Sequence, residues 1–149
     1  MDILKLQQDL KAEIAYYYTA VDKFPSDLQP KRYIGSVLHE YVLGLLFEKG
    51  RSLGYFPLPE FMPYPDTKHR IDMVWVRNEG EIFAGFEVDK TIYPKSVKKL
   101  IGLPDGALKV IVSIGLGKYP LDIAYATRNN IHVFDFTQIA MGVYGKIKE

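Results

Sequence analysis

Three acidic side chains lie within two runs of otherwise apolar residues, and they are the residues of this chain best suited to chemistry. Asp72 belongs to the run 71–76, and Glu87 and Asp89 belong to the run 82–89. Both runs are rich in β-branched and aromatic residues, and a short polar turn containing glycine separates them, which is typical of a β-hairpin. Because both runs are too apolar for strands with one solvated face, we expect them inside a covered sheet.

The spacing of the acids predicts that they share one face of this hairpin. If Val76 lies opposite Phe83, then Glu87 lies opposite Asp72, and Asp89 shares their face because strand side chains alternate. A register slipped by two residues would place Asp72 opposite Asp89 and would still keep the acids together. Facing carboxylates repel, and a buried carboxylate needs a cation or a raised pKa. A hard divalent cation such as Mg²⁺ would satisfy them, since it takes carboxylate oxygens.

These residues resemble the pattern of the PD-(D/E)xK nuclease superfamily, also called restriction-endonuclease-like. In that superfamily an Asp on one strand and a Glu-x-Lys on the next bind metal beside the scissile phosphate. Asp72 and Glu87 match the two acids, and Asp89 stands where the superfamily usually has lysine. A lysine follows at Lys90, which strand alternation aims at the opposite face. The resemblance implies that Asp72, Glu87 and Asp89 hold Mg²⁺ or Mn²⁺ as catalytic residues.

A helix expected over residues 31–49 supplies a fourth candidate ligand. In the resembled superfamily a Glu on the first core helix often completes the metal site, and Glu40 lies at the edge of the apolar stripe of this helix. The alternative interpretation of Glu40 is an edge carboxylate paired with a surface lysine. Its neighbour His39 falls on the far side of the helical wheel, where we expect a solvated histidine rather than a general base.

The densest group of basic residues follows the hairpin directly, in a short helix expected over residues 95–101. Lys95, Lys98 and Lys99 could hold a nucleic-acid backbone near the metal. Lys95 could also replace the missing superfamily lysine, and Lys90 is a less favourably placed candidate for the same catalytic role. Val97, Leu100 and Ile101 are expected to face inward. The alternative is an ordinary solvated lysine face.

Length and composition narrow the remaining possibilities. The 149 residues fit one domain, and the absence of cysteine excludes disulfides, thiolate catalysis and zinc-finger ligation. A net charge of +1 gives no global sign of nucleic-acid binding, so such binding needs a local basic patch. No apolar run reaches roughly eighteen residues, and the first residues lack the layout of a secretion signal. We expect a cytoplasmic protein with no membrane contact.

The expected elements alternate in a way that predicts an α/β fold with a central mixed sheet flanked by helices. They are helices over residues 2–21 and 31–49, a strand within 53–64, the hairpin, a helix over 95–101, a strand over 107–114, a helix within 120–129 and a strand over 131–136. From residue 31 to residue 136 this order resembles the αβββαβ core of the same superfamily. The helix over residues 2–21 is then an addition to that core.

Three functions fit these observations. The first is a Mg²⁺- or Mn²⁺-dependent nuclease, a DNA endonuclease in which Glu40 extends the site and the lysines orient phosphate. The second is a catalytically inactive protein of the same fold that binds nucleic acid or a protein partner. The third is an unrelated α/β domain whose acids are paired with lysines. A homodimer would suit cleavage of both strands of a duplex, but the sequence does not show one.

Overall fold

The computed structural model describes residues 1–22, 34–62, 69–114, 122–137 and 139. Its elements lie within a few residues of the expected ones and follow the expected order. They are α1 (Ile3–Asp22), α2 (Ile34–Ser52), β1 (Phe56–Phe61), β2 (Ile71–Val76), β3 (Ile82–Asp89), α3 (Pro94–Ile101), β4 (Leu108–Ser113), α4 (Ile123–Arg128) and β5 (His132–Asp135). From α2 to β4 the order is therefore helix, three strands, helix and strand.

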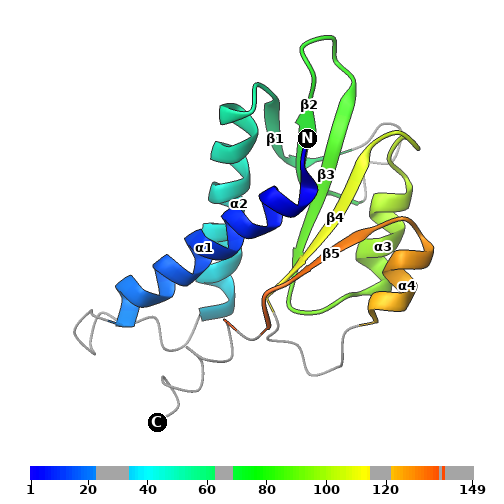
Figure 1. Ribbon diagram of the computed structural model, residues 1–149. Coiled ribbons are helices and arrows are strands. Elements are labelled where there is room, and N and C mark those ends of the chain that lie inside the picture. The colour runs from blue at the N-terminus through cyan, green and yellow to red at the C-terminus, as the bar shows by residue number, and fades with distance from the viewer. Residues whose placement is uncertain (23–33, 63–68, 115–121, 138, 140–149) are drawn as a thin grey trace.

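The strands form one mixed sheet in the order β1-β2-β3-β4-β5. Strand β2 runs antiparallel to both of its neighbours, β1 and β3, whereas β3, β4 and β5 are parallel to one another. The parallel pairs need crossovers, which α3 and α4 provide. Figure 1 shows α1 and α2 on one side of the sheet and α3 and α4 on the other. The expected α/β class, with a mixed sheet flanked by helices, is confirmed.

The face of the sheet beneath α1 and α2 carries the larger apolar core. Buried leucines and isoleucines recur every four residues in α1 and meet a similar row from α2, with Trp75 of β2 between the helices and the sheet. The indole Nε1 of Trp75 donates to the backbone oxygen of Leu46 at 3.0 Å. The added helix α1 is held to α2 by an ion pair of 2.6 Å between Lys49 and Asp9, and by stacking of Tyr17 on Tyr41. The hydrogen bond of Trp75 in turn holds α2 against strand β2 of the hairpin.

The opposite face of the sheet is covered by α3, which approaches β3 closely. A Cβ atom at Gly85 would lie 2.2 Å from Leu103 Cδ1 and 3.5 Å from Leu100 Cδ2, so the glycine leaves room for the leucine side chains in and just after the last turn of α3. The inward face of α3 differs from the expected one. Ser96 is buried together with Val97 and Leu100, whereas Ile101 is 43% exposed. The helix is therefore rotated from the expected orientation, and this rotation matters for its lysines.

The register of the β2–β3 hairpin agrees with expectation over most of its length. Val74 pairs with Gly85 as expected, but Val76 pairs with Ile82 rather than with Phe83. An irregularity between Trp75 and Val76 absorbs this difference of one residue. The shift is confined to the turn end of the hairpin, which we define as residues 77–81 and the strand residues next to them. The far end keeps the expected alignment.

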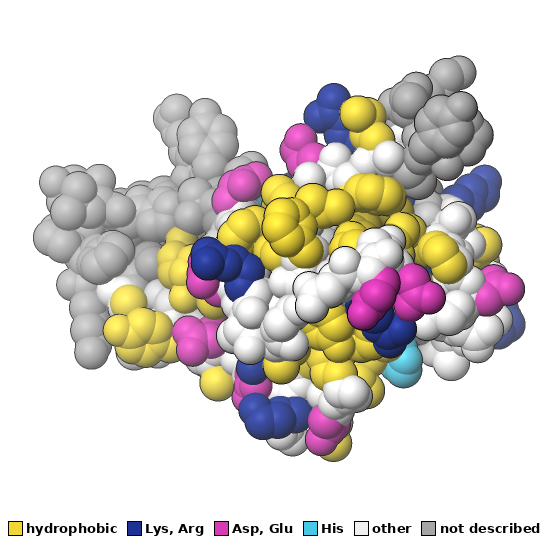
Figure 2. All heavy atoms as spheres, turned by 90° about the horizontal axis from the view of Figure 1, so that it is seen from above, with side chains coloured by type: hydrophobic (Ala, Val, Ile, Leu, Met, Phe, Trp, Pro, Cys, Tyr) yellow, Lys and Arg dark blue, Asp and Glu magenta, His cyan; other side chains and the backbone are white. Residues whose placement is uncertain are grey.

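At the turn end, charged side chains lie in solvent beside an apolar area. Arg77 pairs with Glu81 at 3.1 Å, and the Arg77 guanidinium lies 5.0 Å from the ring centre of Phe83. Figure 2 views the molecule from this side and shows hydrophobic side chains gathered in one area, with acidic and basic side chains around it. Within the described ranges, no helix has both the length and the apolar character needed to cross a membrane.

Strand β1 forms one edge of the sheet, and its sequence limits what that edge can bind. Pro57 and Pro59 pair with Trp75 and Met73 but have no N–H to donate outward. Glu60, the next residue, has a φ of 51°, a left-handed conformation that interrupts an extended strand. The two prolines and the left-handed Glu60 therefore make β1 an irregular strand.

Candidate functional site

The acids gather at the end of the hairpin opposite the turn, which we call the acid end and define by Asp72, Glu87 and Asp89. Regular pairing of β2 with β3 extends to Met73 opposite Phe86. Beyond that pair, side-chain carboxylates accept the hydrogen bonds of the backbone N–H groups in place of carbonyl oxygens. Asp72 N donates to Glu87 Oε2 at 3.0 Å. Val88 N in turn donates to Asp72 Oδ2 at 2.8 Å. Asp72 and Glu87 therefore do come together, as the spacing predicts.

A lysine from α3 lies directly against this acid pair. Lys99 Nζ is 2.8 Å from Glu87 Oε1, and the two side chains are only 17% and 1% exposed. The rotation of α3 that buries Ser96 also brings Lys99 to the sheet side of the helix. A buried carboxylate is thus compensated by a cation that the chain itself supplies.

The protonation of the acid pair is uneven. Burial, with the nearby charge of Asp72 as the second cause, raises the pKa of Glu87 to about 8, and these effects outweigh the opposing influence of Lys99. Burial acts in the same direction on Asp72, but hydrogen bonds with His39, Val88 N and Glu87 lower its pKa overall. The pair therefore carries about one proton near neutral pH, with Asp72 as the ionised partner.

Asp89 lies near the same group and is less fully compensated. Burial raises the pKa of Asp89, the charge of Asp72 adds to this, and a hydrogen bond with Ser96 opposes it. Its Oδ2 atom is buried, and none of the described residues forms a hydrogen bond with it. Because buried polar atoms usually have partners, this oxygen is a natural position for a bound group.

Helix α2 contributes His39 to the site rather than Glu40. His39 Nε2 lies 3.5 Å from Asp72 Oδ2, and the hydrogen bond with Asp72 raises the pKa of the imidazole. The expectation of a solvated His39 is therefore wrong. Glu40 is 77% exposed, and its Oε1 atom lies 3.5 Å from His39 Nδ1. The expectation that Glu40 reaches the other acids is not met, because that position of the helix faces solvent.

The other candidate lysines lie apart from the acid pair. Lys90, Lys95 and Lys98 are exposed. No ion pair joins any of them to an acid within the part of the chain that the structure describes. Lys95 therefore makes no ion pair with the acids; Lys99, expected only to bind a nucleic-acid backbone, is the lysine that contacts Glu87. Sequence reasoning missed this role of Lys99 and the contact of His39 with Asp72.

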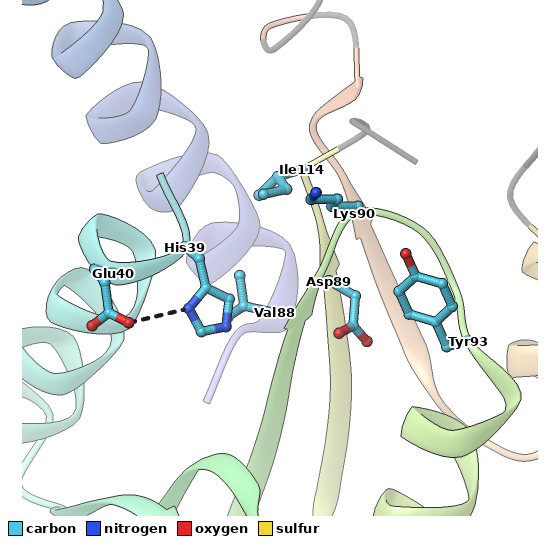
Figure 3. A pocket seen from close by; sticks show the side chains of 7 residues that line it. All are labelled: His39, Glu40, Val88, Asp89, Lys90, Tyr93 and Ile114. Carbon is cyan, nitrogen blue, oxygen red and sulfur yellow. Dashed lines mark ion pairs between the residues drawn. The ribbon is translucent and has the colours of Figure 1, made fainter. Parts of the chain in front are cut away.

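A hollow of about 380 Å³ opens beside the acid end. Figure 3 shows Asp89 between His39 and Tyr93, with Glu40 beyond His39. The apolar side chains of Val88 and Ile114 and the exposed Lys90 complete the lining (His39, Glu40, Val88, Asp89, Lys90, Tyr93 and Ile114). Asp89 thus connects the buried acid pair to an open surface.

The donor atoms suit a hard divalent cation, although they are not arranged around one. Among the residues placed by the structure, no three His, Cys, Asp or Glu side chains are positioned to hold a metal ion. The site nevertheless offers carboxylate oxygens, which Mg²⁺ and Mn²⁺ prefer. One of these oxygens, Asp89 Oδ2, has no hydrogen-bond partner among the described residues, and another, Glu87 Oε1, lies 2.8 Å from Lys99 Nζ. The chemistry of the residues therefore fits such an ion.

Comparisons with models of known protein families, with curated proteins and with solved structures found no match to this chain.

Proposed function

We propose that this protein is a divalent-metal-dependent nuclease that hydrolyses phosphodiester bonds and acts as an endonuclease on DNA. The observation that carries the proposal is the meeting of Asp72, Glu87 and Lys99 at the acid end. Two acids on neighbouring strands and one lysine resemble the PD-(D/E)xK arrangement, with the lysine supplied by α3. The order from α2 to β4 also resembles the αβββαβ core of that superfamily.

In this proposal Asp72, Glu87 and Asp89 hold Mg²⁺ or Mn²⁺. The ion would supply a bound water of lowered pKa and would stabilise negative charge on the phosphate. Asp72 lies on the strand next to Glu87, and Asp89 lies two residues further along β3, so a bound ion would require these side chains to turn toward one another. Asp89 also borders the hollow, so it is the acid through which the site reaches substrate.

The other side chains position these groups and bind phosphate. Lys99 places a positive charge beside the acid pair, where it can donate to a phosphate oxygen and stabilise the developing charge. His39 holds Asp72 through the contact at Oδ2. Lys90, Lys95 and Lys98 are exposed nearby and would contact the nucleic-acid backbone without reading its sequence.

The test is cleavage of plasmid, single-stranded and branched DNA in MgCl₂, in MnCl₂ and in EDTA. We expect metal-dependent cleavage that Glu87→Gln abolishes, because the amide keeps the shape of the side chain and loses its charge. Glu81→Gln is the matched control, since it makes the same change at the turn end of the same hairpin. Equal cleavage by the Glu87→Gln protein, or no heat of Mn²⁺ binding in calorimetry, would contradict the proposal.

One observation favours the second candidate, a catalytically inactive protein of the same fold. Lys99 and the proton on Glu87 already compensate the acid pair, so the site is tolerable without a metal ion. A protein of this kind would bind DNA equally well in EDTA and in MgCl₂ and would cut none of the substrates. The same set of assays therefore separates the two candidates.

The third candidate, a scaffold whose acids merely pair with lysines, accounts for only part of the site. Glu87 does contact a lysine, but the partner of Asp72 is a histidine. Asp89 has an unpaired oxygen and lines a hollow. These two features favour the nuclease proposal over a purely structural role.

A further inference from the structure

We infer that the hollow beside Asp89 takes one unpaired nucleotide, so that the substrate presents a single-stranded stretch or end to the acid site. This inference rests on the proposed function and concerns the substrate class of the same site. Its basis is the combination of a flat aromatic side chain, a cation and an acid around one opening.

The walls of the hollow suit a flat, partly polar ligand. Tyr93 is 39% exposed and stands on one side of Asp89, while the half-buried imidazole of His39 stands on the other (Figure 3). The buried side chains of Val88 and Ile114 give the hollow an apolar surface. A volume of about 380 Å³ falls within the roughly 300–1,000 Å³ of small-ligand pockets. One nucleotide is a ligand of this size and character.

The aromatic wall is what favours an unpaired nucleotide over intact duplex. The bases of a duplex are paired and stacked on one another, so a base can enter the hollow and lie against Tyr93 only where the strand is unpaired. Proteins that bind single strands combine such aromatic platforms with cations along the backbone. Tyr93 immediately precedes α3, so a base stacked on it would lie beside the helix that carries Lys99.

The charges around the opening determine which part of the nucleotide points where. Lys90 lines the hollow and can contact a phosphate, whereas Lys99 lies against Glu87 and is not part of the lining. Glu40 also lines the hollow and repels phosphate, on the side of His39 away from Asp89 (Figure 3). The phosphate is therefore expected beside Lys90 and away from Glu40, with the base against Tyr93.

Binding of labelled DNA to the full chain tests this arrangement. The probe is a short 5′-fluorescein oligonucleotide with 2-aminopurine at its other end, used as a single strand, as a duplex with an overhang and as a blunt duplex. Fluorescence anisotropy and 2-aminopurine quenching are measured in CaCl₂ and in EDTA, and a denaturing gel verifies that the probe stays intact. We expect at least about 10-fold tighter binding of the single strand and the overhang than of the blunt duplex, with quenching of 2-aminopurine.

Substitutions at Tyr93 provide the decisive comparison. Its side chain makes no capping hydrogen bond, so its removal leaves the start of α3 intact. Tyr93→Ala should weaken single-strand binding about 10-fold and remove the quenching, whereas Tyr93→Phe keeps both. Tyr16→Ala is the matched control, since Tyr16 is an exposed tyrosine of α1 that does not line the hollow.

The outcomes separate this inference from the proposed nuclease function. Equal binding of blunt duplex and single strand, or a Tyr93→Ala protein that binds like the unmodified chain, overturns the inference even if metal-dependent cleavage is found. Selective, Tyr93-dependent binding supports it, and if cleavage is then absent with every substrate, the nuclease proposal alone fails.

Discussion

The two ends of the β2–β3 hairpin place charged side chains in opposite environments. At the turn end, Arg77 and Glu81 form an ion pair whose members are both largely solvated. At the acid end, Glu87 is buried beside Asp72, and its pKa is raised to about 8. The same hairpin thus carries a solvated ion pair in its turn and a largely buried group of charges at its other end.

This difference separates charges that need no partner in the fold from charges that are stable only when other groups of the protein compensate them. A surface pair contributes little to stability, whereas buried acids are costly unless cations and donors surround them. At the acid end a lysine from α3, a histidine from α2 and two backbone N–H groups all converge. Such a concentration of unfavourable charge is typical of functional sites.

Among the substitutions compared at the two ends, Glu87→Gln should have the largest effect, and this effect is on the rate of cleavage. We expect Glu87→Gln to lower metal-dependent cleavage at least about 100-fold, since a catalytic metal contributes several kcal/mol to the reaction. Initial rates of plasmid nicking in MnCl₂ measure the effect. The same substitution at Glu81 should leave the rate unchanged, and parallel losses at both positions would show that the two ends do not differ as we describe.

Removing Lys99 should destabilise the protein in a pH-dependent manner. Lys99→Met leaves Glu87 without its cation, and we expect a loss of about 3 kcal/mol in the free energy of unfolding at about pH 9. At about pH 6 the loss should be only about 1 kcal/mol, because Glu87 is then protonated and needs no cation. Urea unfolding at both pH values checks this. In a Glu87→Gln background, Lys99→Met should have a small effect that does not change with pH.

The pKa shifts predict that the metal-free protein becomes less stable as pH rises from about 6 to about 9. The pKa of Glu87 is raised from 4.5 to about 8, so the folded state binds more protons than the unfolded state between these values. The raised pKa of His39 acts in the same direction. The lowered pKa of Asp72 gives stability that is lost only in acid, below its ordinary value.

Thermal unfolding in EDTA measures this pH dependence. The Tm should fall by several degrees over the interval, since each kcal/mol corresponds to roughly 2–4 °C in a domain of this size. Glu87→Gln should flatten the curve. A Tm that rises over this interval would contradict the burial of a protonated Glu87.

The smallest effect is expected at the turn end. Glu81→Gln removes a solvated ion pair, so the Tm should change by less than about 2 °C at any pH. Thermal unfolding at low and high salt serves as the measurement. A larger shift would mean that the turn end contributes to stability through this pair.

The sequence predicts the meeting of Asp72 and Glu87 because strand alternation is a strict geometric rule. It does not predict the irregularity at Trp75 and Val76, since nothing in their side chains marks a local break in pairing. The expected alignment survives at the acid end because the break lies on the other side of Val74. The predicted meeting of Asp72 and Glu87 is therefore correct even though the predicted pairing of Val76 is wrong.

The helices show why the remaining site residues were not predicted. The apolar stripe of α2 is so wide that its centre cannot be read from sequence, and the structure places that centre on Leu38, Val42 and Leu46. This orientation brings His39 toward the sheet and leaves Glu40 in solvent. In α3 the buried face contains Ser96 and leaves out Ile101, and this rotation brings Lys99 to Glu87. A pattern of hydrophobic residues does not indicate that a serine is buried, so the rotation could not be predicted from sequence.

The prolines and the left-handed Glu60 of β1 also restrict how two copies of the chain could assemble. An edge without a regular row of outward N–H groups is a poor template for a further strand, so the sheet is not readily continued across that boundary into a neighbouring molecule. A pair of protomers joined on that side would have to rely on contacts between side chains instead of a shared ladder.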